Sequence, residues 1–273
     1  PFRDRVVHHA LCNLIEPLFE RQFIFDSYAN RVGKGTHRAL DRATLYMRRY
    51  RYVLPLDVCQ FFPSIDHAIL FNRLRRTIAD PQVLDLCQRI LRSGQGVLAA
   101  EYQMTYFPGD DLFAANRPRG LPIGNLTSQF WANVYLNDFD HFVKRHLRVP
   151  GYVRYVDDML LFGDDLPDLH RWRAAAIQRL AGLRLTVHAG SAQPRPCRVG
   201  LPFLGFQLFT DHRRLKHQKV VAARRRLRQY LQEYRAGQRT RAQMHASIQG
   251  WINHARYADT WGLRRAILQE VVL

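Results

Sequence analysis

The chain has 273 residues, of which 47% are hydrophobic and 12% aromatic, as in globular domains rather than disordered segments. Its 41 Lys and Arg against 23 Asp and Glu give a formal net charge of +18, which favours nucleic acid as the partner over an anionic membrane surface. The sequence contains no apolar run long enough to span a bilayer and no Cys-x-x-Cys pair, so neither a membrane span nor a zinc site or disulfide framework is predicted. We expect a cytoplasmic protein with no membrane partner.

The first half of the chain predicts helices around one apolar strand. Apolar residues recur at helical spacing over 5–20, and the Gly-rich basic segment 33–36 leads into a helix that we expect Thr36 to cap. That segment does not fit a phosphate-binding loop, which needs Ser or Thr directly after its Lys. A strand is predicted over 52–58, then helix over 68–98. The stretch from about residue 94 to 119 is interpreted as a loop or a distorted hairpin.

The second half predicts a long helix over 127–147, a hairpin with Asp157 and Asp158 at its tip, and a helix over 168–181. Further strands are predicted over 183–188 and 201–209. After residue 211 the composition becomes strongly basic, and residues 213–273 predict a separate, all-helical module.

The adjacent aspartates of the hairpin indicate a metal site. Two carboxylates on so short a turn repel each other unless a cation lies between them, although a solvated acidic turn is the alternative. Asp57 ends an apolar strand, where a lone charge is costly unless it is coordinated. Three aspartates supply the hard oxygen ligands that two divalent ions need for phosphoryl transfer, and the backbone carbonyl of Val58 completes one coordination sphere. We therefore predict Asp57, Asp157 and Asp158 as catalytic metal ligands.

Four ordered segments resemble the motifs of a reverse transcriptase: Leu56-Asp57-Val58 with Phe61-Phe62-Pro63-Ser64-Ile65-Asp66, then Gly120-Leu121-Pro122-Ile123-Gly124-Asn125-Leu126-Thr127-Ser128-Gln129, then Tyr155-Val156-Asp157-Asp158, then Phe203-Leu204-Gly205-Phe206. The resemblance runs from residue 1 to about 210. It implies an α+β right-hand polymerase with fingers, a ferredoxin-like palm of antiparallel sheet and helices, and a helical thumb. The expected divisions are fingers over 1–50, palm over 51–67, an insertion over 68–119, palm over 120–212 and thumb over 213–273.

Within that superfamily the chain resembles the reverse transcriptases of diversity-generating retroelements. Group II intron and retron enzymes usually carry Gln where this chain has Ile123, and Pro where it has Gln129. The resemblance implies copying of an RNA template into cDNA, with errors at adenines, for diversification of a target gene in a bacterial, archaeal or phage-encoded system. It also implies two Mg²⁺ ions (Mn²⁺ is the alternative), dNTPs, an RNA/DNA primer-template and a small basic helical accessory protein. The alternatives are an intron-like, retron or phage-defence reverse transcriptase, and a non-catalytic RNA-binding protein.

The same resemblance assigns roles to further residues. Phe62 corresponds to an aromatic steric gate against the 2′-hydroxyl of ribonucleotides, and Ile123, Gly124 and Gln129 correspond to the nucleotide site. An apolar Ile123 makes only shape contacts, which discriminate less than hydrogen bonds do, so we expect it to lower fidelity. Template or primer contacts are expected from the following residues: Arg31, Lys34, Arg38, Leu204, Gly205, Arg224, Arg225 and Arg228.

Two departures from the resemblance bear on activity. The Arg-containing finger strand that usually precedes the opening segment is not found, so we expect a truncated chain that lacks some triphosphate contacts. His188 occurs between Arg184 and Ser191 but no Lys does, so the sequence assigns no proton donor to pyrophosphate.

We predict that Phe62→Ala admits ribonucleotides, because removal of the ring opens the space that a 2′-hydroxyl needs. The ratio of dNTP to rNTP incorporation in primer extension measures this. An unchanged ratio would exclude Phe62 as the gate.

Overall fold

The computed structural model describes residues 2–188 and 190–272, so the predicted domain ends at Pro1 and Leu273 lie outside the described residues. The chain divides into two compact units. The first unit comprises residues up to 46 together with 50–195. The second comprises 47–49 and the chain from Pro196 onward.

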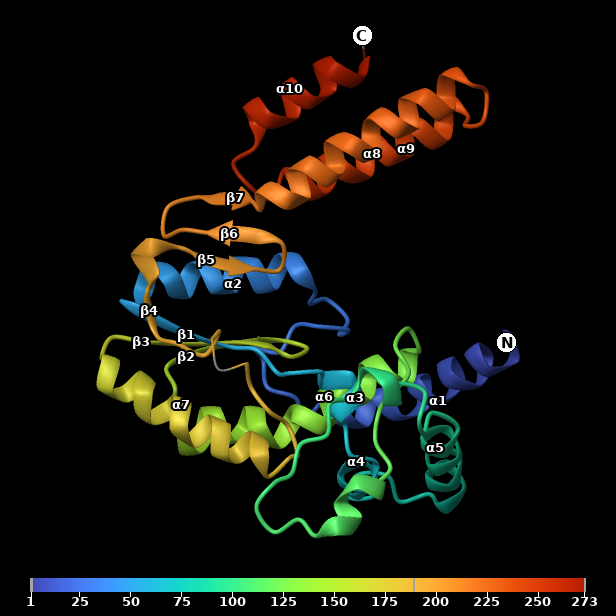
Figure 1. The fold of residues 1–273 in the computed structure, drawn as a ribbon, viewed down its shortest axis with the longest axis vertical. Helices are drawn as coiled ribbons and strands as arrows, with labels where there is room; N and C mark the ends of the chain where they lie inside the picture. The colour runs from blue at the N-terminus through green and yellow to red at the C-terminus, as the bar shows by residue number, and fades with distance from the viewer. Residues whose placement is uncertain (1, 189, 273) are drawn as a thin grey trace. The chain divides into compact units, whose positions relative to one another are not determined.

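An antiparallel sheet forms the centre of the first unit (Figure 1). Its strand order is β2-β3-β1-β4, and the strands are β1 Tyr52–Leu56, β2 Gly151–Tyr155, β3 Asp158–Gly163 and the short β4 Arg195–Pro196 at the edge. β3 pairs with β2 on one side and β1 on the other. This central position explains the continuous apolar run Met159-Leu160-Leu161-Phe162, which is buried on both faces.

Helices cover the sheet and position the hairpin. The α-helices of the first unit are α1 Phe2–Glu20, α2 Thr36–Arg49 (except its residues 47–49), α3 Phe61–Ser64, α4 His67–Leu74, α5 Pro81–Ser93, α6 Leu126–His141 and α7 Leu166–Ala181. Figure 1 shows α6 and α7 along one face of the sheet, and α1 packs against α6. α6 is buried around most of its circumference, and its buried residues include the polar Asn133 and Asp140 beside apolar ones such as Trp131. A single large core joins the sheet to α1, α4, α5, α6 and α7.

Several predicted elements are corrected by the structure. The predicted helix over 68–98 is two helices, because α4 ends at Leu74 and a new helix, α5, begins after Asp80, whose carboxylate caps it. α2 is capped by Gly35 and not by Thr36, which is already helical. The predicted strand over 183–188 is reduced to one isolated bridge between Val58 and Val187. The irregular stretch contains two short 3₁₀ helices, η1 Ala99–Glu101 and η2 Leu112–Asn116, and no hairpin.

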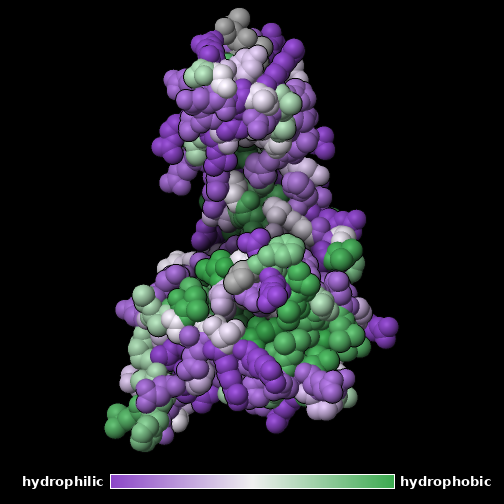
Figure 2. Space-filling model, turned by 90° about the vertical axis from the view of Figure 1, so that its right-hand side faces the viewer, coloured by the Kyte–Doolittle hydropathy of each residue, from purple (hydrophilic) through white to green (hydrophobic). Residues whose placement is uncertain are grey.

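Helix α1 has two apolar stripes of which only one is buried. Leu11, Ile15 and Phe19 enter the core, whereas Leu14 and Leu18 remain exposed. The space-filling view onto this side of the molecule shows a broad apolar area on the first unit (Figure 2). The helical periodicity was therefore sufficient to predict the helix but not which stripe is buried.

The second unit combines a small sheet with three helices. Strands β5 Leu201–Phe203, β6 Phe206–Leu208 and β7 Arg213–Leu215 form an antiparallel sheet, and the helices are α8 His217–Arg235, α9 Arg241–Ala255 and α10 Trp261–Val272. The expectation of an all-helical module from residue 213 is therefore wrong, because 213–215 is a strand. The helices enclose a core around Leu227 and Ile267. None of the helices in the described ranges is long and apolar enough to cross a membrane.

Candidate active site

The hairpin β2–β3 carries two of the predicted catalytic aspartates, and β1 carries the third. Tyr155 pairs with Asp158 across the hairpin, with Val156 and Asp157 as its two-residue turn. β1 pairs with β3 in a register that places Leu56 opposite Met159. Continuing that register by one residue puts Asp57 opposite Asp158. The three aspartates therefore lie at one end of the neighbouring strands β1 and β3, and their role as metal ligands stays a prediction.

The electrostatics of Asp157 show that a second carboxylate is near. Burial raises the pKa of the Asp157 carboxyl above its usual range, and the Asp57 carboxylate raises it further. The backbone N–H of Asp157 and the charge of Arg154 act in the opposite direction and lower this pKa. Like charges held close together in a partly buried site are stabilised by a bound cation.

The backbone next to Asp57 is fixed by a bridge to the segment after α7. The N–H of His188 donates to the Asp57 carbonyl (3.0 Å) and the N–H of Cys59 donates to the Thr186 carbonyl (2.8 Å). Between these two bonds Val58 faces Val187 in a non-hydrogen-bonded pair, so the Val58 carbonyl points away from Val187. Its predicted role as a metal ligand stays a prediction.

The donor set fits a hard divalent cation. Carboxylate oxygens are the ligands that Mg²⁺ and Ca²⁺ prefer, and the mutual repulsion of Asp57 and Asp157 is the electrostatic condition that such an ion relieves. Across residues 2–188 and 190–272, no three His, Cys, Asp or Glu side chains are already arranged as a metal site.

Arg154, which the sequence did not single out, anchors the hairpin. Its guanidinium is fully buried and donates from Nε and Nη2 to the carboxylate of Asp140 on α6, at 2.7–3.0 Å. Its Nη1 donates to Asn133 Oδ1 and to the carbonyl of Val156, both at 3.1 Å. Nη2 also donates to Ser27 Oγ (3.1 Å). One side chain thus ties the catalytic turn to α6 and to the segment before α2.

The anchored turn has an unusual backbone. Val156 adopts φ 56°, a left-handed conformation that a β-branched residue rarely takes. The hydrogen bond from Arg154 to the Val156 carbonyl stabilises this backbone conformation. The adjacent Tyr155 hydroxyl lies 3.0 Å from Thr36 Oγ1, so the Thr36 hydroxyl contacts the hairpin instead of capping α2.

The predicted nucleotide residues lie on two segments that are bonded to each other. The N–H of Leu121 donates to the Phe62 carbonyl (3.0 Å) and the N–H of Gly120 donates to the Ile65 carbonyl (2.9 Å). Phe62 is half-buried against Phe61, with ring centroids 5.5 Å apart. Ile123 is 66% exposed, so its side chain is not part of the buried core.

Gly124 and Gln129 share a cavity of about 400 Å³ with three residues of α1 that the sequence did not predict, namely Arg5, His8 and His9. Burial lowers the pKa of His8, and its Nδ1 lies 2.6 Å from Thr127 Oγ1. Gly124 has φ 98°, a conformation for which only glycine carries no penalty. The sequence patterns could not find Arg5, His8 and His9, because their proximity to 124–129 is a product of the α1–α6 packing.

The three predicted template contacts in and just before α2 differ in their surroundings. The Arg31 side chain is 5% exposed, and it bonds to the Glu20 carboxylate and to the carbonyls of Ile24 and Ser27. These contacts are structural. Lys34 donates to the Phe25 carbonyl and covers the Phe25 ring at 3.3 Å, whereas Arg38 is exposed on α2.

The remaining predicted contacts all belong to the second unit. Leu204 and Gly205 form the β5–β6 turn, with φ values of 47° and 87°. Arg225 and Arg228 are exposed on α8, and Arg224 is half-buried. Their roles at a template-primer stay predictions.

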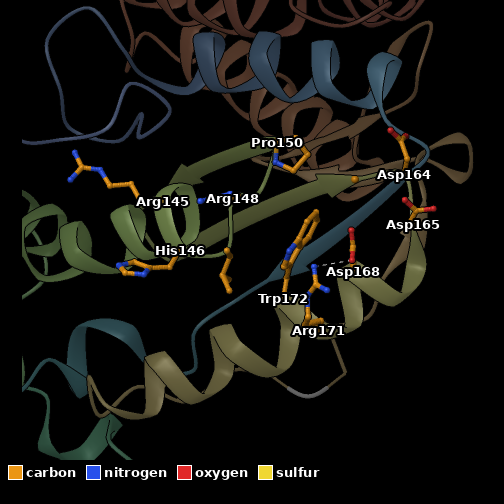
Figure 3. A pocket seen from close by; sticks show the side chains of 11 residues that line it. Arg145, His146, Arg148, Pro150, Asp164, Asp165, Asp168, Arg171 and Trp172 are labelled. Atoms are coloured by element: carbon orange, nitrogen blue, oxygen red, sulfur yellow. Dashed lines mark ion pairs between the residues drawn. The ribbon is translucent and has the colours of Figure 1, made fainter.

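A cavity of about 660 Å³ lies at the opposite end of the hairpin from Asp157 and Asp158. Figure 3 shows Arg145 and His146 on one side of it, Asp164, Asp165 and Asp168 on the other, and Trp172 between them. No residue of the predicted site lines this cavity, so we do not assign it to the chemistry of the hairpin.

Comparison with known protein families matches residues 1–207 to the family described as reverse transcriptase (RNA-dependent DNA polymerase). The chain belongs to this reverse transcriptase family. Members of the family generally use divalent metal ions, which agrees with the donor set at the hairpin.

The most similar sequences include proteins of group II introns. The reverse transcriptase is 27% identical to protein YkfC of Escherichia coli K12 over 146 residues, which is 52% of this chain and 35% of that protein. It is 26% identical over 142 residues to the group II intron-encoded protein LtrA of Lactococcus lactis, covering 52% of this chain and 22% of LtrA. Nuclear intron maturase 1 of Arabidopsis thaliana is 30% identical over 91 residues, 33% of this chain and 13% of the maturase. The matches thus cover about a third or less of these relatives.

A solved structure supports the fold. The structure of telomerase from Candida albicans, in complex with a fragment of telomeric RNA, aligns with a TM-score of 0.52 at 10% identity. The alignment covers 98% of this reverse transcriptase and 47% of the telomerase chain. At this level of identity, the likeness concerns the fold alone.

We predict that breaking the Arg154–Asp140 pair from either side destabilises the first unit by about 3 to 5 kcal/mol, since each single change leaves a buried charge uncompensated. Arg154→Met and Asp140→Leu should each show this loss in urea unfolding. The double variant should lose clearly less than the sum of the two.

The exposed pair Arg89–Asp85 on α5 is the matched control, and Arg89→Met with Asp85→Leu should cost less than about 1 kcal/mol. Additive losses at Arg154 and Asp140 would show that the two side chains act independently.

Proposed function

We propose that the chain is an RNA-directed DNA polymerase that copies an RNA template into cDNA by nucleotidyl transfer at Asp57, Asp157 and Asp158. The observation that carries this is the convergence of these carboxylates at the ends of β1 and the β2–β3 hairpin, in a chain that belongs to the reverse transcriptase family. A purely binding protein has no use for such a cluster of like charges, because it destabilises the folded state unless a cation is bound.

In the proposed reaction the three aspartates hold two Mg²⁺ ions, with Mn²⁺ as the alternative. When bound, the ions would activate the primer 3′-hydroxyl and neutralise charge on the departing pyrophosphate. The chain itself positions these ligands: Arg154 and Thr36 fix the hairpin, and the His188 N–H fixes the backbone of Asp57. Phe62 and the 120–124 loop, bonded together, are proposed to contact the incoming dNTP. The basic face of the second unit is proposed to follow the template-primer backbone.

We predict that Asp157→Asn lowers Mg²⁺-dependent primer extension on an RNA template by at least about a thousand-fold, because one ligand and its charge are lost from the reacting centre. Asp164→Asn is the matched control, since Asp164 follows β3 outside the site and its Oδ1 accepts a bond that an amide oxygen can also accept. If Asp157→Asn still extended primers, and this extension still required divalent ions, the metal site would have to lie at other residues.

We further propose that copying is error-prone at template adenines and serves diversification of a target gene, with a small basic helical accessory protein as partner. This rests on the resemblance to diversity-generating retroelements and on the exposure of Ile123, which leaves its apolar side chain available to a nucleotide. Contacts from the Ile123 side chain would discriminate between correct and incorrect nucleotides by shape alone.

We predict that Ile123→Gln lowers the misincorporation rate opposite adenine by about ten-fold, the effect of one added hydrogen bond that only a correct pair satisfies. Sequencing of cDNA made in vitro measures the rate. Ile123→Val, which keeps an apolar β-branched side chain, should retain the errors. Equal error rates in all three enzymes would exclude the side chain from fidelity.

An intron-type reverse transcriptase is the second candidate, because LtrA and the nuclear maturase are among the relatives. A template repeat and a variable target gene beside the coding sequence would favour the first candidate. An enclosing group II intron would favour the second.

A further inference from the structure

A second cavity of the first unit, of about 620 Å³, lies between the segment after α1 and the end of α6. Its walls include Arg21 and Phe25 from the segment after α1, and Asn137, His141, Lys144 and Arg145 from α6 and the π-helix η3 Phe142–His146 that follows it. None of these residues belongs to the predicted catalytic site. The cavity therefore needs a separate explanation.

Phe25 is the unusual member of this group. Its side chain is 69% exposed, although a large aromatic ring gains free energy when it is removed from water. The Lys34 ammonium lies 3.3 Å from the ring centroid, and the Arg42 guanidinium lies 5.8 Å from it. An exposed ring beside cations is the arrangement on which unpaired bases stack while their phosphates are neutralised.

The charge on the cavity walls is positive. Two carboxylates also line it, but both are compensated within the chain. Asp26 accepts from Arg42 and from the hydroxyls of Tyr28 and Tyr46, and Asp138 pairs with Arg73 and Arg76. By contrast, Arg21 and Arg145 are exposed and form no ion pair within the described ranges, and Lys144 donates only to the Val149 carbonyl.

The cavity wall also contains an unsatisfied acceptor. Asn137 is 8% exposed, and its Oδ1 has no hydrogen-bond partner in the residues that the structure describes. A buried amide oxygen without a donor is costly, and a bound polar group can supply that donor after a small side-chain rotation.

We propose that this cavity, with Phe25 at its edge, is a docking site for single-stranded nucleic acid. The cavity combines a base-stacking ring, a set of uncompensated cations and a buried acceptor. That the ligand is RNA, as the unpaired part of the template, rests on the proposed function. Phe25 directly precedes Asp26, whose carbonyl accepts from the Arg154 N–H, so the site is joined through the backbone to the catalytic hairpin.

The first experiment tests stacking in the full chain, with fluorescein-labelled A12 RNA as the probe and anisotropy as the readout. Phe25→Leu should weaken binding by about five-fold or more, because an aliphatic side chain cannot stack on a base, and Phe25→Trp should retain binding. Phe113→Leu is the matched control, since Phe113 is 75% exposed outside the cavity. Unchanged binding by Phe25→Leu, or an equal loss in Phe113→Leu, would overturn the proposal.

The second experiment tests the cations through salt dependence. The double variant Arg21→Gln, Lys144→Gln should reduce the slope of log affinity against log salt by about 1.4, since each phosphate contact on a single strand contributes about 0.7. The control is Arg75→Gln, Arg92→Gln, which removes two exposed arginines outside the cavity. An equal reduction by both variants would indicate only a diffuse basic surface.

Two further probes separate the ligand sources. A 12-base-pair RNA duplex should bind Phe25→Leu and wild type equally, because its bases are not free to stack; a Phe25-dependent loss would overturn the stacking geometry. If Phe25→Leu weakened binding of dA12 DNA but left binding of A12 RNA unchanged, the assignment to RNA would be overturned.

Primer extension by the wild-type chain on a short annealed template tests the polymerase separately. Loss of A12 binding in Phe25→Leu therefore stands whether or not extension is observed.

Discussion

The buried ion pair between Arg154 and Asp140 is the interaction on which the arrangement of the catalytic hairpin depends. Both side chains are completely removed from solvent, so each charge is tolerated only because the other is present. The remaining donors of Arg154 go to Asn133, Ser27 and the Val156 carbonyl. A charged side chain placed two residues before the turn thus fixes α6, the segment before α2 and the turn itself in one network. An apolar pair could fill the same volume but could not hold a carbonyl in place.

This network also explains why the hairpin tolerates two adjacent aspartates. The Arg154 charge lowers the pKa of Asp157 and opposes the effects of burial and of Asp57. In the proposed metal site, Arg154 would therefore support the charged form of Asp157 that a divalent ion needs.

The sequence was sufficient to predict the central strands and the positions of the three aspartates on them, but not the side chains that hold the hairpin in place. Asp57, Asp157 and Asp158 were found because strand ends and tight turns are encoded locally, within a few residues. Arg154 was missed because its partners lie 14, 21 and 127 residues away in the chain. Arg31 was predicted as a template contact because a basic residue near a Gly-rich loop suggests binding to a polyanion. In the structure its donors bond to Glu20 and to two backbone carbonyls. The division near residue 195 was also not visible, since the strands of the second unit have the same apolar pattern as those of the first.

The left-handed Val156 has a consequence for how the enzyme matures. A valine at that position does not favour the turn by itself, since β-branched residues resist positive φ. The hairpin tip therefore gains its geometry only when α6 has docked and Arg154 has reached Asp140, so the turn depends on contacts that are distant in sequence. Before α6 docks, Asp57 is not held beside the hairpin that carries Asp157 and Asp158. Formation of the proposed metal site would then require the completed core of the first unit.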